Sequence, residues 1–220
     1  MSRNWHLHFY YFNMEKLDLT KKYKNYYTAK TKPEIININE AQYISIIGKG
    51  DPSDKLFAEN IEALYSVAYT IKFNFKALDK DFVVSKLEGL WWFDEKKHKD
   101  ITIANAPKLI PRSEWEYRLL IRMPDFVSKN DISTAMQKVT FKKGIEKAKA
   151  VEFYTMNEGK VVQMLHVGPF DKEPESLQKI SELITSLGLK RNGLHHEIYL
   201  SDFRKTEPLK LKTILREPVK

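Results

Sequence analysis

The feature that most constrains the fold is an order of elements that occurs twice along the chain. Residues 41–123 and about 150–216 each show, by hydrophobic pattern, a strand, a glycine turn, a helix and then two strands. The turns combine glycine, proline and aspartate, as Gly50-Asp51-Pro52 and Gly168-Pro169-Phe170-Asp171. This duplication predicts an α+β fold of antiparallel sheets with helices on one face. We expect the uncovered sheet faces to line a central ligand groove.

Apolar spacing predicts where the individual elements lie. Helical spacing is found in 15–28, 53–75, 129–143 and 173–188. Strands are expected at 34–39, 41–50, 82–93, 114–123, 150–156, 160–167, 193–200 and 209–216. The charged and proline-containing segment 94–113 is expected to be a loop or flap. Residues 1–13 are interpreted as an N-terminal extension or arm, and residues 14–220 as a single domain.

The stretch from His195 to Leu200 places polar chemistry on one face of a strand. Because side chains alternate along a strand, His195, Glu197 and Tyr199 share a face. Ile198 and Leu200 lie on the other face and suit packing under a helix. A buried glutamate is costly unless it is paired or hydrogen-bonded. Glu197 is therefore either a functional carboxylate in a pocket or half of a cross-strand ion pair with Lys or Arg, and the sequence leaves both open.

Aromatic residues in the first unit are candidates for the walls of the groove. Trp91 and Trp92 are adjacent on a strand and must face opposite ways, whereas Trp115 and Tyr117 share a face. Glu88 lies in the same region as a possible second carboxylate. Aromatic walls around a carboxylate suit a flat and often cationic ligand. The alternative is that these rings only fill the core.

Composition and motifs exclude several other classes of protein. The chain has no cysteine, which excludes disulfides and thiolate metal sites and fits a cytoplasmic location. The net charge of +8 comes from lysines mixed with acids along the chain, so we expect no direct nucleic-acid binding. No stretch is long and apolar enough to span a membrane. Histidine spacing gives no metal motif, and neither a phosphate-binding loop nor a nucleophile elbow is present.

Several motifs resemble those of the GyrI-like small-molecule-binding family, whose domain also serves as the effector domain of AraC- and MerR-type regulators. These motifs are Gly48 to Pro52, Leu87 to Trp92, Gln163 to Asp171, His195 to Asp202 and Leu211 to Arg216. The resemblance covers the chain from about Met14 and is closest to the stand-alone branch. It implies tandem SHS2-type modules around a central groove, with an acidic residue at the position of Glu197. Some stand-alone members hydrolyse cyclopropane rings of DNA-alkylating natural products.

The resemblance gives the candidate residues their roles. Glu197 is expected to activate water or handle a proton, with Tyr199 or Tyr117 as its hydrogen-bonding partner. The expected ligand-binding residues are Glu88, Trp91, Trp92, Trp115 and His195. No cofactor and no metal are expected.

Three functions remain open at this stage. The first is a detoxifying hydrolase of cyclopropane-bearing alkylators, and the second is a non-catalytic binder or sensor of multidrug type. The third is an interaction protein that resembles a gyrase inhibitor. The expected partner is an aromatic or cationic small molecule, and the protein is expected to be a monomer or homodimer.

Overall fold

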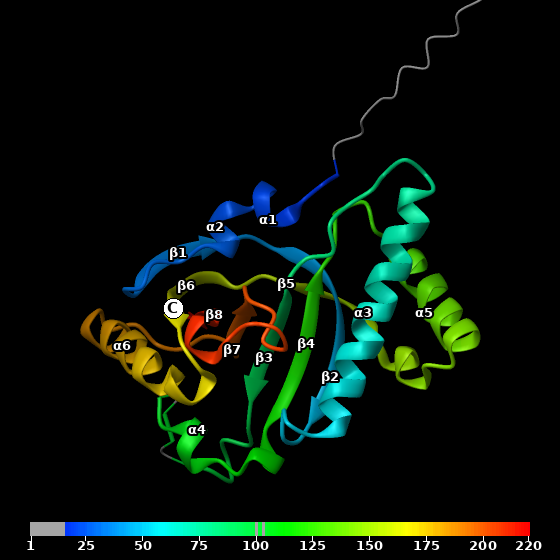
Figure 1. Ribbon diagram of the computed structural model, residues 1–220. Coiled ribbons are helices and arrows are strands. Elements are labelled where there is room, and N and C mark those ends of the chain that lie inside the picture. The colour runs from blue at the N-terminus through cyan, green and yellow to red at the C-terminus, as the bar shows by residue number, and fades with distance from the viewer. Residues whose placement is uncertain (1–15, 100, 103) are drawn as a thin grey trace, which may run out of the picture.

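The structure is a computed structural model that describes residues 16–99, 101–102 and 104–220 (Figure 1). Within them, one antiparallel sheet of eight strands has the order β1-β6-β8-β7-β3-β4-β2-β5. The strands are β1 (Glu34–Ile38), β2 (Ala41–Lys49), β3 (Leu87–Trp92), β4 (Glu116–Arg122), β5 (Glu152–Met156), β6 (Gly159–Val167), β7 (His195–Tyr199) and β8 (Lys212–Pro218). The α+β class is confirmed. The predicted arm, residues 1–13, lies outside the described residues.

The helices differ from the expected ones mainly near the N-terminus. They are α1 (Leu19–Lys22), α2 (Lys24–Tyr27), α3 (Lys55–Lys76), α4 (Ala106–Leu109), α5 (Lys129–Lys143) and α6 (Glu173–Ser186). The single helix expected over 15–28 is two short helices, because the backbone leaves the helical region at Tyr23. Helix α5 has the predicted bounds, with a capping box at Ser128 and a left-handed Gly144 at its end. No helix in the described residues is long and apolar enough to cross a bilayer.

The strand order shows how the two units are joined. Both β2-α3-β3-β4 and β6-α6-β7-β8 follow the predicted order of strand, helix, strand and strand. In the sheet they appear as β6-β8-β7 followed by β3-β4-β2, so each strand of one unit mirrors its counterpart about the β7–β3 junction. At this junction Gly89 is opposite Glu197 and Trp91 is opposite His195. The assignment to SHS2 modules stays a prediction.

Helices α3 and α6 lie on the same face of this continuous sheet, one over each half (Figure 1). The cross-strand register places Leu119, Gly89, Glu197 and Leu215 side by side on that face. Leu119 packs in the core cluster under α3, and Leu215 packs in the cluster under α6. The expectation that the groove lies on the faces without helices was therefore wrong. Because the halves form one sheet, the strip that carries Gly89 and Glu197 lies between the two helices.

The opposite face of the sheet is covered by the N-terminal segment. Ile198 and Ile214 pack there against Leu19 of α1 and Tyr26 of α2. Ile198 thus lies under a helix, as expected, but under the short N-terminal helices rather than under the long helix of its own unit. The N-terminal segment therefore covers this face of the sheet.

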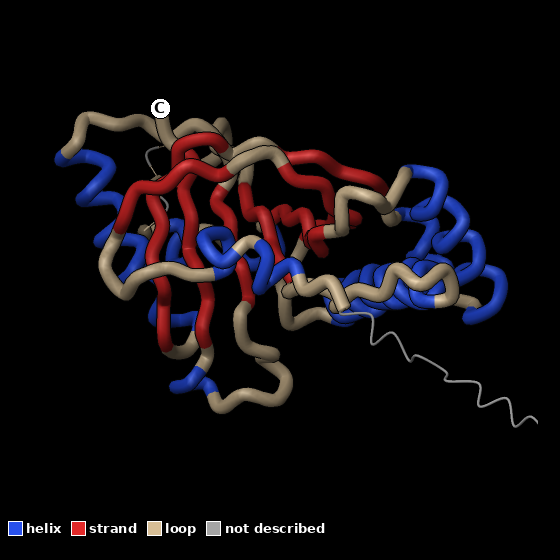
Figure 2. Tube along the Cα trace, turned by 90° about the horizontal axis from the view of Figure 1, so that it is seen from above, coloured by secondary structure: helices blue, strands red, loops and turns tan. Residues whose placement is uncertain are grey.

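The two strand–strand loops each pack on the helix of the other half. In the loop between β3 and β4, Ala104 packs against the cluster under α6. In the loop between β7 and β8, Phe203 packs against the cluster under α3. Figure 2 shows the long helices gathered at two opposite sides of the strands. These loops therefore bound the space between α3 and α6.

Candidate functional site

Strand β7 presents a carboxylate at the centre of the α3–α6 face. Glu197 lies opposite Gly89 of β3, at the junction of the two halves. A Cβ atom at position 89 would lie 2.8 Å from the indole nitrogen of Trp91 and 3.1 Å from the Tyr199 hydroxyl. Glycine at this position therefore leaves room for Trp91 and Tyr199 to meet over β3 beside the carboxylate.

The side chain of Glu197 is held by two neighbours on its own strand. The Tyr199 hydroxyl donates to Oε2 at 2.7 Å, and Nε2 of His195 donates to Oε1 at 3.3 Å. The Trp91 indole N–H in turn donates to the Tyr199 hydroxyl at 3.0 Å. Within the described residues, the ion pair of Glu197 is with His195 and not with a lysine or arginine. Only 13% of the Glu197 side chain is exposed, so the carboxylate is fixed and mostly dry.

His195 is an imidazolium between two carboxylates. Burial alone lowers its pKa, but the Glu217 charge and the hydrogen bonds to both glutamates raise that pKa to about 10. Its Nδ1 contacts Glu217, which also accepts from the Arg191 guanidinium at 3.0 Å. Glu197 and Glu217 are therefore balanced by His195 and Arg191.

Tyr199 keeps its proton next to this cluster. Burial, followed by the charge of Glu197, raises its pKa well above the ordinary value. The neutral hydroxyl donates to Glu197 and accepts from Trp91, so both of its polar functions are engaged. Tyr199 is thus better suited to orient Glu197 than to release a proton to a ligand.

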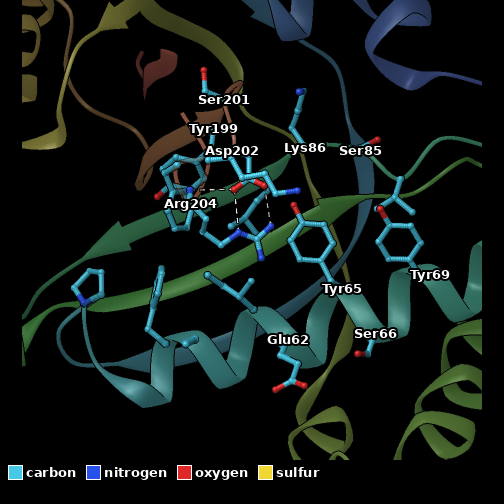
Figure 3. A pocket seen from close by; sticks show the side chains of 18 of the residues that line it. Glu62, Tyr65, Ser66, Tyr69, Ser85, Lys86, Tyr199, Ser201, Asp202 and Arg204 are labelled. Carbon is cyan, nitrogen blue, oxygen red and sulfur yellow. Dashed lines mark hydrogen bonds and ion pairs between the residues drawn. The ribbon is translucent and has the colours of Figure 1, made fainter. Parts of the chain in front are cut away.

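A groove of about 850 Å³ begins at the ring of Tyr199 (Figure 3). It lies between α3 and the loop after β7, and Figure 3 shows Tyr65 rising from the helix toward Asp202 and Arg204. Its main aromatic lining residues are Phe57, Tyr65, Tyr69, Tyr199 and Phe203. The rings of Phe170, Tyr199 and Phe203 meet edge to face, each pair with centroids 6.1 Å apart. Glu197 does not line this groove and is linked to it through Tyr199, which lines the groove and donates to the carboxylate. Such an aromatic groove can hold a flat ligand.

Several groove residues were not among the predicted site residues. Tyr65 and Tyr69 line the groove four residues apart on α3, and Phe73 continues the row outside the groove, with successive ring centroids 6.3 Å apart. That spacing is visible in the sequence as an aromatic stripe on a helix. The loop residues Phe203 and Arg204 carry no such signal, because only the fold brings them over α3.

Glu173 is a further carboxyl group that the sequence did not mark. It is the first residue of α6 and is only 7% exposed, and its Oε1 has no hydrogen-bond partner among the described residues. Burial and then the Glu197 charge raise its pKa well above the usual value. The sequence gives no signal for this burial, because an acidic residue in the first turn of a helix is common.

The remaining predicted aromatic residues on this face form a second layer. Trp91 contacts Tyr117 with centroids 5.4 Å apart and Trp115 with centroids 6.4 Å apart. The Tyr117 hydroxyl is fully buried and accepts from the Asn60 amide at 3.1 Å. The structure therefore brings Trp91, Tyr199 and His195 to Glu197, whereas Tyr117 and Trp115 support Trp91 from behind.

Glu88 and Trp92 lie on the opposite face of the sheet, away from the groove. They alternate with Gly89 and Trp91 on β3, so the pleat directs them the other way. Glu88 is fully buried and accepts from the Tyr26 hydroxyl at 2.5 Å and from His196 at 3.1 Å. Trp92 donates to Glu116 at 3.1 Å. The structure thus separates both residues from the Glu197 cluster.

Glu88 belongs to a buried polar network beneath the N-terminal helices. His196 bridges Glu88 to Glu158 through its two ring nitrogens, and Arg216 donates to Glu158 at 3.0 Å. Burial opposes ionisation of Glu158, but the charges of His196 and Arg216 lower its pKa to about 2. Two buried cations thus balance two buried carboxylates, which is the arrangement expected of a structural core.

The described residues offer no group of three or more His, Cys, Asp or Glu side chains arranged to hold a metal ion. What the arrangement provides is suited to acid–base chemistry: a Glu197 carboxylate oriented by His195 and Tyr199, a buried Glu173 whose pKa is raised, and an aromatic groove that shares Tyr199 with the cluster.

Comparisons with known proteins agree with this architecture. The GyrI-like small molecule binding domain family matches residues 31–220, so the chain belongs to that family. An uncharacterized conserved protein from Listeria innocua is 37% identical, with a TM-score of 0.83 over 93% of this chain and 100% of that one. A hydrolase from Listeria innocua is 36% identical, with a TM-score of 0.80 and the same coverage.

A more distant structure shares only the fold. The EcmrR C-terminal domain is 10% identical, with a TM-score of 0.55 over 86% of this chain and 97% of that one. No curated protein matched the chain. The class defined by fold and site is thus a small-molecule-binding domain.

Proposed function

We propose that this protein hydrolyses flat aromatic electrophiles, in particular DNA-alkylating compounds that carry a strained cyclopropane ring. The observation that carries the proposal is the Glu197 carboxylate, held by His195 and by Tyr199, whose ring lines an aromatic groove. The hydrolase from Listeria innocua, 36% identical over nearly the whole chain, supports the same class of activity. Detoxification of such compounds is the role that follows.

The reaction we propose adds one water to the cyclopropane. Glu197 takes a proton from water as the water oxygen bonds to a ring carbon. The carbon–carbon bond breaks, and its electron pair moves through the conjugated dienone to the dienone oxygen, which becomes a phenol on taking up a proton. The groove rings hold the flat ligand in register for attack. Because Tyr199 and His195 are fixed by their own partners, they keep Glu197 aimed without reorganising.

Charges around the groove favour this proposal over a binder of hydrophobic cations. Glu197 and Glu217 are offset by His195 and Arg191, so the cluster has no uncompensated negative charge to attract a cation. Basic residues outnumber acidic residues among the charged residues of the groove. The basic residues are Lys86, Lys143, Arg204 and Lys205, and the acidic residues are Glu62 and Asp202. A neutral electrophile with oxygen acceptors fits this rim better than a cation.

The proposal is tested by incubating the protein with a cyclopropane-containing alkylator and weighing the small molecule by mass spectrometry. We expect a product heavier by one water with the natural protein and only the spontaneous rate with Glu197→Gln. Quenching of tryptophan fluorescence by the compound reports binding, because Trp91 adjoins the site. Binding without any product would refute the hydrolase and support a non-catalytic binder.

A further inference from the structure

Glu173 lies against the Tyr199 end of the site. It follows the turn Phe170–Lys172 directly, and the Phe170 ring contacts Tyr199 with centroids 6.1 Å apart. Thr213, which lies opposite Tyr199 on β8, is fully buried on the same sheet face. The start of α6 is therefore packed over the strands that carry Glu197 and Tyr199.

The groups that face Glu173 leave its carboxyl without an ion pair. The charged or polar groups around it are Glu197, His195 and Tyr199 on β7, Thr213 on β8 and, on β6, His166. His195 is already bonded to Glu197 and Glu217, and His166 is bonded to the Ser176 hydroxyl and the Pro169 carbonyl of the α6 segment. No described residue satisfies Oε1.

The energetics keep this carboxyl neutral. The N-terminus of α6 favours a carboxylate. Burying an unpaired ion costs more than the helix N-terminus supplies, and the neighbouring Glu197 charge adds repulsion. The loss outweighs the gain, so the proton stays on Glu173. A buried carboxyl oxygen without a partner also destabilises the fold, and a purely structural residue would not be expected to retain that cost.

We propose that Glu173 is the proton donor of the site and acts on the ligand oxygen while Glu197 acts on water. This inference rests on the proposed hydrolase function and supplies its missing acid. Tyr199 cannot easily serve, since its proton is bonded to Glu197 and its oxygen to Trp91. Two carboxyl groups in different environments, one paired with His195 and one buried without an ion pair, then divide base and acid roles.

The proton balance of the step closes on these groups and solvent. One proton passes from water to Glu197 as the new carbon–oxygen bond forms. Another passes from Glu173 to the former dienone oxygen as the ring carbon–carbon bond breaks. Transfer of one proton from Glu197 to solvent and of one from solvent to Glu173 restores both groups.

The test compares Glu173→Gln with Glu175→Gln. Glu175 is in the same helical turn but its side chain is 71% exposed, so it controls for charge at the helix start. The readouts are kcat/KM for the alkylator against pH, fluorescence-detected binding and the thermal midpoint. For Glu173→Gln we expect a loss of about 10²–10⁴-fold in kcat/KM, no alkaline fall in the remaining activity, and unchanged binding and midpoint. Glu175→Gln should match the natural protein.

An infrared spectrum tests the protonation state without any turnover. The natural protein should show the carbonyl stretch of a protonated carboxylic acid at neutral pH, and Glu173→Gln should lose it. Natural-like activity and pH profile in Glu173→Gln would overturn the inference alone, as would a parallel loss of binding and thermal midpoint, which marks a structural residue. No product even from the natural protein would instead refute the hydrolase function, and this proposal with it.

Discussion

Replacing Tyr199 by phenylalanine removes one hydroxyl that joins Glu197 to Trp91. A hydrogen bond to a charged group contributes about 1.5–3 kcal/mol to stability. The variant also leaves the Trp91 indole N–H without its acceptor, which adds to the loss of stability. Tyr117→Phe is the matched control, because it removes a hydroxyl from the same core whose hydrogen-bond partner among the described residues is the Asn60 amide. A neutral bond of this kind is worth about 0.5–1.5 kcal/mol. Tyr199→Phe should therefore be the more destabilised variant.

The two variants should separate more clearly in turnover than in stability. Without its tyrosine partner Glu197 loses one of two anchors, and misplacement of a catalytic group by about 1 Å costs about 10²-fold in rate. We expect that loss in kcat for Tyr199→Phe and unchanged kcat for Tyr117→Phe. Urea unfolding gives the stability, and mass spectrometry of the alkylator gives the rate. Equal effects on kcat in both variants would refute the assignment of Tyr199 as the residue that orients Glu197.

Other predictions concern charge and space in the core. The Glu158 pKa falls from 4.5 to about 2 on folding, so its contribution of about 3 kcal/mol is present above pH 4.5 and lost as pH falls toward 2. Glu158→Gln should flatten urea stability over that range, and an unchanged acid limb would contradict this. The His195 pKa is raised to about 10, so its contribution is present below pH 6.5 and lost as pH rises toward 10. His195→Gln should remove the alkaline loss of stability seen by the same measurement, whereas a persistent loss would point to other groups. Gly89→Ala places a Cβ 2.8 Å from the Trp91 indole nitrogen and should lower kcat for the alkylator, while natural activity would show that the site tolerates the shift.

The sequence predicted correctly which side chains share a face of β7, but it did not predict which helices cover each face of the sheet. Alternation placed His195, Glu197 and Tyr199 together, and the structure confirms that grouping. Alternation defines two faces without saying which of them a helix will cover. That depends on how the halves join, and here they form one sheet with both long helices on one face.

Residues whose partners are distant in sequence were the hardest to predict. Glu88 has the alternation and aromatic neighbours of a site residue, yet it lies in a network with His196, more than a hundred positions away. Glu173 shows the reverse case, because an ordinary helix-starting acid becomes a buried neutral carboxyl only when α6 packs on the sheet. Local pattern carries no information on either outcome, since both are decided by tertiary burial.

The measurement that tests the central claim most directly is turnover of a cyclopropane-containing alkylator in ¹⁸O-labelled water. The natural protein and Glu197→Gln would be compared at equal occupancy, set by tryptophan fluorescence. The account predicts that the natural protein yields a ring-opened product containing one labelled oxygen, while Glu197→Gln binds the compound and adds nothing to the spontaneous rate. Equal incorporation of label by both proteins would contradict the role of Glu197 as the residue that activates water.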